Sequence, residues 1–141
     1  MESNTDKAAK EAPKEPPKYD WVTERSRCSL PKVFHTLRGQ VEEDVKTRNA
    51  LRPENSSYEF SVTENIDEFA VVLQANEVRE SISFRLAEHT IVVRDDKGNL
   101  LFDVIATFSE DGKCKLYVNE AEHDFWQVRR MALEGLMFRG S

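Results

Sequence analysis

The spacing of apolar residues along the chain predicts a long helix in its first half. Between residues 29 and 51 the apolar side chains recur every three or four positions, which is the period of an α-helix. The stripe consists of Leu30, Val33, Phe34, Leu37, Val41 and Val45. Ser29 is placed to cap the first turn. Pro53 ends the helix, because the residue before a proline avoids the helical region.

From residue 58 onward the period falls to two, which is typical of strands with one packed face and one wetter face. Six alternating runs cover residues 58–63, 69–76, 81–86, 91–94, 100–108 and 113–118. Two of the intervening segments, 95–98 and 110–112, carry the Asp and Gly residues that favour tight turns. These runs predict about six strands in an antiparallel meander.

A second helix is predicted to open at Asn119, with Glu122 three residues further on as a variant of the capping box. Its apolar surface is broad and comprises Phe125, Trp126, Met131, Ala132, Leu133, Leu136, Met137 and Phe138. Such breadth predicts burial on more than one side, so we expect Trp126 to be buried. The sequence therefore predicts an α+β fold in which a long N-terminal helix and a long C-terminal helix pack on one face of the sheet.

The first eighteen residues have a different composition from the rest. They hold three of the five prolines, four lysines and four acids, with no large apolar residue after Met1. Because such a segment has no apolar surface to bury, it predicts a disordered leader over residues 1–18 and a single domain over 19–141. Residues 19–24 form a short aromatic stretch, and this stretch is either an edge strand or an aromatic anchor that pins the leader to the core.

Net charge, hydropathy and cysteine content indicate which partners and which cellular compartment to expect. The chain has 141 residues and a net charge of −6, and it lacks a long apolar run. We therefore expect no membrane span and no nucleic-acid partner.

Cys28 and Cys114 are the two cysteines. A bridge between them is possible, but small secreted folds normally carry four or more cysteines. The sequence favours a cytoplasmic protein with two free thiols.

The residues that usually carry catalysis do not form a recognisable motif. The three histidines are His35, His89 and His123, and their spacing is not that of a metal site. Cys28, at a helix entrance, and Asp103, in the middle of a strand, are the best isolated candidates. Both are more simply structural residues. We therefore predict no catalytic residues, no cofactor and no metal, and a protein that is not an enzyme.

One face of the predicted sheet carries more apolar side chains than a solvated face needs. The candidate interface on it consists of Val72, Leu101, Asp103, Ile105 and Tyr117. A symmetric homodimer is the commonest way to cover such a patch. In that contact Asp103 would need a cation or a hydroxyl, and Lys115 and Arg85 are the nearest candidates. The prediction is a small interaction or assembly module with an unknown protein partner.

The order of elements supports an alternative function. A short strand, a helix, six antiparallel strands and a long last helix are similar in order to the helix-grip fold, in which the sheet curls around that helix. This resemblance implies a cavity under the C-terminal helix, and Phe125, Trp126 and Leu133 are the candidate lining residues. The alternative is therefore a domain that binds a small hydrophobic ligand.

Overall fold

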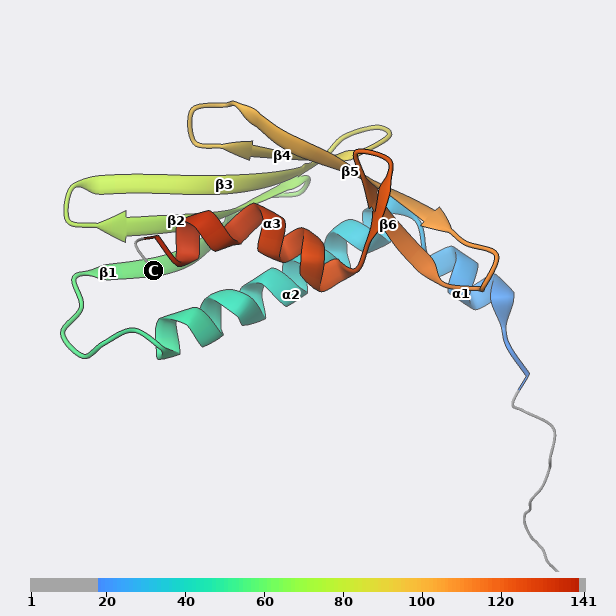
Figure 1. Cartoon of the computed structure of the whole chain (residues 1–141), viewed down its shortest axis with the longest axis horizontal. Coiled ribbons are helices and arrows are strands. Elements are labelled where there is room, and N and C mark those ends of the chain that lie inside the picture. The colour runs from blue at the N-terminus through green and yellow to red at the C-terminus, as the bar shows by residue number, and fades with distance from the viewer. Residues whose placement is uncertain (1–17, 140–141) are drawn as a thin grey trace, which may run out of the picture.

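An antiparallel sheet, two helices on one of its faces and a short N-terminal helix make up the described part of the chain, residues 18–139 of a computed structural model (Figure 1). The helices are α1 (Trp21–Arg27), α2 (Leu30–Ala50) and α3 (Phe125–Met137). The strands are β1 (Tyr58–Glu64), β2 (Glu68–Ala75), β3 (Val78–Leu86), β4 (Ile91–Asp95), β5 (Leu100–Phe108), β6 (Cys114–Val118) and β7 (Ala121–His123). The seven strands lie in chain order. The predicted α+β meander, packed by α2 and α3, is confirmed.

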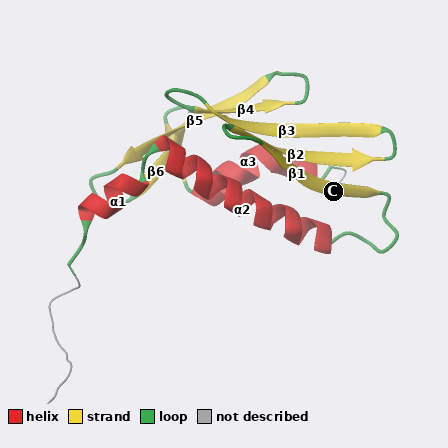
Figure 2. Cartoon of the chain, turned by 180° about the vertical axis from the view of Figure 1, so that it is seen from behind, coloured by secondary structure: helices red, strands yellow, loops and turns green. Residues whose placement is uncertain are grey.

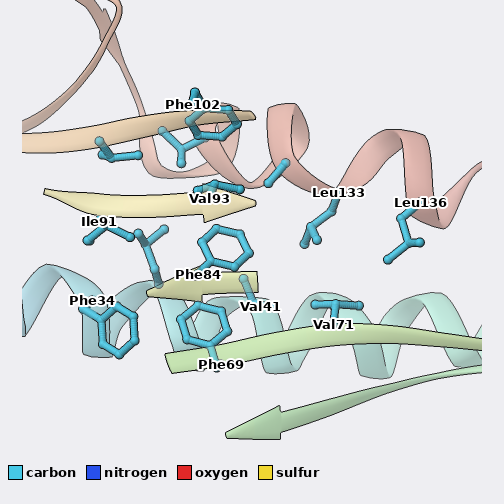
Figure 3. Close-up of a cluster of buried hydrophobic side chains, with 14 of the residues drawn as sticks. Phe34, Val41, Phe69, Val71, Phe84, Ile91, Val93, Phe102, Leu133 and Leu136 are labelled. Atoms are coloured by element: carbon cyan, nitrogen blue, oxygen red, sulfur yellow. The ribbon is translucent and has the colours of Figure 1, made fainter. Parts of the chain in front are cut away.

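Aromatic side chains from three elements form the centre of the core (Figure 3). The ring of Phe69 on β2 stacks on that of Phe84 on β3, with centroids 4.7 Å apart, and lies 5.2 Å from the ring of Phe34 on α2. Each fully buried side chain of this size contributes about 1.5–3 kcal/mol of hydrophobic stabilisation. The predicted stripe of α2 and the predicted inward phase of the strands therefore meet in one core.

The prediction that the last helix opens at Asn119 is wrong. Asn119 and Glu120 both adopt positive φ, at 53° and 67°, which is the geometry of the tight turn that joins two antiparallel strands. The chain therefore turns back, and β7 pairs with β6. The helix begins at Phe125, where the side chains of Asp124 and Gln127 form the capping box. This hairpin supplies the seventh strand.

The aromatic stretch at residues 19–24 is not a strand. Asp20 caps α1 by accepting a hydrogen bond from the backbone N–H of Thr23 at 3.1 Å. The Tyr19 hydroxyl donates a hydrogen bond to the carbonyl of Gly112, so the aromatic-anchor interpretation describes this contact better. Helix α1 contributes no buried residue to the core. Apart from Lys18, the predicted leader lies outside the described residues.

The prediction of two free thiols is also wrong, because Cys28 and Cys114 form a disulfide. The residues are 86 positions apart in sequence, and their Cα atoms lie 5.4 Å apart. Tertiary packing brings the two cysteines together, because the junction between α1 and α2 lies against β6. A bonded cysteine is no nucleophile, so Cys28 is not a catalytic candidate. Disulfides are rare in the cytosol, and this one weighs weakly against the cytoplasmic location, which stays a prediction.

Helices of the described chain are too short or too polar to cross a bilayer.

Candidate interaction site

The three residues predicted to line a cavity diverge in the structure. Leu133 is buried, and Phe125 packs half-buried against the core. Trp126 is 52% exposed, so the expectation of a buried ring is wrong. Helical phase does not explain this exposure, because Trp126 lies on the same side of α3 as the buried Leu133, seven residues further on; it depends instead on how α2 and α3 cross. The candidate cavity residues therefore do not share one enclosed space.

Trp126 instead belongs to an open groove between α2 and α3, which we call the α2–α3 groove. The groove has a volume of about 390 Å³. Its apolar lining consists of Leu51 from the end of α2 and Trp126, Leu133, Met137 and Phe138 from α3 and its C-cap. Leu133 and Met137 are buried, whereas Trp126, Leu51 and Phe138 are exposed. The groove thus has a buried apolar floor and exposed apolar walls.

The charged residues of the α2–α3 groove are partnered within the fold. Arg129 pairs with Asp44, with Nε 2.6 Å from Oδ2, and its Nη1 donates to Gln40 at 2.8 Å. Arg130 pairs with Glu134 on the same helix at 3.0 Å. Because the charges are neutralised locally, the groove offers a partner an apolar surface with a fixed polar border.

Arg48 fixes one end of the groove. Its Nε donates to the carbonyl of Met137 at 2.7 Å, which satisfies a backbone acceptor at the end of α3. Its guanidinium also lies 5.0 Å from the ring centroid of Phe138 and 5.2 Å from that of Phe60. These cation–π contacts hold Phe138 beside the groove while its ring stays about half exposed.

The outer face of the sheet, opposite the helices, brings together three of the five predicted interface residues. Ile105 on β5 is the direct cross-strand partner of Tyr117 on β6. Both line a hollow of about 470 Å³ together with Asp103. Ile105 is 43% exposed. We call Asp103, Ile105 and Tyr117 the outer patch.

The other two predicted interface residues lie elsewhere. The β4–β5 register shifts between Val93 and Arg94, and Leu101 lies in a hollow lined by α3. Val72 is on β2 and only 4% exposed. Alternation predicts which face of the sheet a side chain lies on, but it does not predict how deeply neighbouring side chains cover it. Lys115 pairs with Glu122 at 3.0 Å, and this hydrogen-bonded contact raises the pKa of Lys115. Lys115 is therefore already paired with Glu122 and is not available as the cation that Asp103 would need.

In the described residues, no group of three or more His, Cys, Asp or Glu side chains is arranged to hold a metal ion. Comparison with known proteins found no matching family model, no matching curated protein and no matching solved structure. The site is therefore interpreted from its own chemistry.

Sequence reasoning missed the α2–α3 groove as a unit. Leu51 and Phe138 follow the ends of their helices, where the helical period no longer indicates which side they face. Arg48 reads as an ordinary solvated residue on an amphipathic helix. The breadth of the apolar surface on the last helix is the available signal, but by itself it predicts burial rather than a binding surface.

Proposed function

We propose that this chain is a non-catalytic protein-interaction domain and that the α2–α3 groove is its binding site. The observation that carries the proposal is the exposed indole of Trp126 beside the buried floor of Leu133 and Met137. Tryptophan and arginine dominate the binding energy of protein interfaces, and clustered exposed apolar side chains mark such interfaces. Trp126 and Phe138 lie at the two ends of α3, so the groove is about 18 Å long. That length suits an amphipathic helix of a partner protein.

The ligand-binding alternative has less support. Leu133 and Leu136 of α3 belong to the same buried cluster as side chains of α2 and the sheet (Figure 3). The hollow that holds Trp126 and Leu133 is open to solvent, whereas Phe125 packs against the core. An apolar small molecule needs a site that encloses most of its surface.

A photo-crosslinking experiment tests the proposed binding site. A photoreactive phenylalanine analogue replaces Trp126 in one variant and Ile66 in the control, since Ile66 is 95% exposed in the β1–β2 loop. We expect a specific crosslinked product from position 126 and not from position 66. The partner identified in this way should bind the purified chain, and Trp126→Ala should weaken that binding about a hundredfold while Ile66→Ala leaves it unchanged.

Two outcomes would contradict the proposal. One is a crosslinking pattern from position 126 that does not differ from that of position 66. The other is a purified partner that binds the Trp126→Ala variant as tightly as the original chain.

A second candidate, carried by a separate observation, is self-association through the outer patch. Ile105 and Tyr117 are adjacent, partly exposed and far along the sheet from the β1–β2 hairpin. A two-fold contact would cover both side chains with their own copies. We therefore propose a weak homodimer as an additional property of the domain.

A further inference from the structure

Within residues 18–139, nearly half of strand β3 has no neighbouring strand on one of its sides. Strand β2 pairs with β3 along its whole length, from Val78 to Arg85. Strand β4 pairs with β3 only from Ile82 onward, because β4 ends at Asp95 opposite that residue. Figures 1 and 2 show the β2–β3 hairpin extending past the end of β4. We call residues 78–81 the free edge of β3.

Two residues of the free edge direct their backbone groups away from β2. The N–H of Leu86 donates to the carbonyl of Asp67 on the β2 side, at 2.8 Å. Since alternate residues of a strand direct these groups to the same side, Arg79 and Ser81 direct theirs toward the β4 side. No loop or turn within residues 18–139 hydrogen-bonds to the backbone of Arg79 or Ser81. The free edge therefore offers two donors and two acceptors in the spacing of a strand.

Strand β1, at one edge of the sheet, shows how this fold covers the backbone groups of another exposed strand edge. The Asn49 side chain donates to the carbonyl of Phe60 at 2.8 Å and accepts from its N–H at 3.0 Å. Arg52 donates to the carbonyl of Tyr58. The end of α2 thus occupies the hydrogen-bonding groups of β1, as proteins commonly do to prevent unwanted pairing. Within residues 18–139, no side chain hydrogen-bonds to the backbone of Arg79 or Ser81 in this way, although the Glu80 side chain pairs with Arg139.

Two hollows meet at the free edge, one on each face of the sheet. The inner hollow, of about 560 Å³, has Met131, Ala132 and Leu136 of α3 and Leu101 of β5 among its apolar lining residues. The outer hollow, of about 450 Å³, has Val72 and Ser83 among its lining residues. Ser81, Asp95 and Asp96 line both. Alternate side chains of a strand point to opposite faces, so a strand added here would place one set in each hollow.

The two hollows differ in the side chains that they would accept. The inner hollow offers apolar contacts from α3, and it is also lined by Lys97 and by the ion pair between Glu80 and Arg139. The outer hollow has four carboxylates, from Glu64, Glu68, Asp95 and Asp96, and two guanidinium groups, from Arg79 and Arg94. Hydrogen bonds from the backbone N–H and the side chain of Asn99 to the Asp95 carboxylate lower the pKa of Asp95. Basic side chains therefore complement the outer hollow.

A second copy of the folded chain does not fit the free edge through its own β3. Antiparallel pairing of residues 78–81 with their copies would place each β2–β3 turn opposite Ile82 and the residues after it, where β4 already lies. A flexible extended segment that ends or bends away at Asp95 avoids this collision. The edge accommodates about four residues, or roughly 13 Å of strand.

We propose that the free edge of β3 binds an extended segment of a partner protein by β-strand addition. The segment places apolar side chains against α3 and lysine or arginine side chains in the outer hollow. Backbone hydrogen bonds to Arg79 and Ser81 supply affinity, and the two hollows supply the alternating apolar–basic preference. This proposal is independent of the α2–α3 groove.

The test uses a fluorescent peptide of four Lys-Val repeats and measures its anisotropy with the purified full chain. We expect saturable binding. Ser81→Pro should weaken it at least about tenfold, because proline removes the N–H at the free edge while the groups that pair with β2 belong to other residues. Ser81→Ala keeps that N–H and is the matched control, which should bind like the original chain.

Further variants keep the test decisive. If Ser81→Pro fails to fold, as judged by circular dichroism, Met131→Glu replaces it, because Met131 is an exposed residue of α3 and the charge enters the inner hollow. This variant should also weaken binding about tenfold. A matched peptide of Glu-Val repeats should bind more weakly than the Lys-Val peptide.

Several results would overturn the proposal. The first is no saturable binding of the Lys-Val peptide up to about 1 mM. The second is unchanged affinity in a folded Ser81→Pro or Met131→Glu variant. The third is loss of binding in Trp126→Ala, which would place the peptide in the α2–α3 groove instead.

Discussion

Trp126 and Leu133 lie on the same helix and line the same groove, yet they should contribute to the protein in opposite ways. Trp126 is about half exposed, whereas Leu133 is buried in the core. We expect Leu133→Ala to lower the free energy of unfolding by about 2–5 kcal/mol, because it leaves a cavity. Trp126→Ala should change it by less than about 1 kcal/mol, since much of the indole already contacts water. Chemical denaturation of both variants measures the difference.

Equal losses of stability in the two variants would contradict this division of roles. A large loss in Trp126→Ala would mean that the indole stabilises the packing of α2 on α3. Its effect on partner binding could then not be separated from its effect on the fold.

At the residue scale, sequence periodicity predicted the side of an element on which a residue lies better than it predicted how deeply that residue is buried. The buried phases of α2 and the strands followed directly from the apolar spacing, as Phe69 and Phe84 show. Trp126 was placed wrongly because its exposure depends on the direction in which α2 crosses α3. Leu101 was placed wrongly because a one-residue shift of register at Val93 and Arg94 changes what a side chain meets. Neither effect is local in the sequence.

At the scale of elements, α1 depends on a few contacts beyond itself. It buries no residue in the core, and it is flanked by the Cys28–Cys114 disulfide and the Tyr19–Gly112 hydrogen bond. We expect Cys28→Ala combined with Cys114→Ala to lower the stability by about 2–4 kcal/mol, because the bridge closes a loop of many residues in the unfolded chain. The amide protons of α1 should then exchange faster, while those of α2 remain protected.

Thermal melting and hydrogen exchange, each with and without a reducing agent, measure these effects. The double variant is the control, because a reducing agent should not change it further. An original chain that melts at the same temperature and keeps the protection of α1 after reduction would show that the bridge stabilises nothing.

The same scale explains why the last hairpin escaped prediction. The acidic residues after residue 118 fit the first turn of a helix. The chain turns there because Asn119 and Glu120 take up positive φ, and Glu seldom does so. The pairing of β7 with β6 stabilises that conformation, and sequence propensity alone does not indicate it.

At the scale of the whole molecule, each strand pairs with its neighbour in the chain, so the order of the sheet could be predicted from the sequence. The binding surfaces could not, because they join distant segments. The α2–α3 groove combines Leu51 with Trp126, and the free edge of β3 lies beside Met131. Such surfaces depend on how far each strand extends and how the helices cross.

The last prediction concerns the outer patch and the oligomeric state of the protein. Asp103, Ile105 and Tyr117 form a smaller patch than the five residues expected from the sequence, so a dimer through it should be weak. We expect light scattering on a sizing column to show a mass that rises with concentration from 16.3 kDa toward twice that value. Ile105→Lys should keep the chain monomeric, because a two-fold contact would bring two buried lysines together. Leu101→Lys is the matched control, since Leu101 is exposed to the same degree but lies in the hollow beside α3. A monomer at every concentration, or the same change of mass in both variants, would remove the outer patch as a dimer interface.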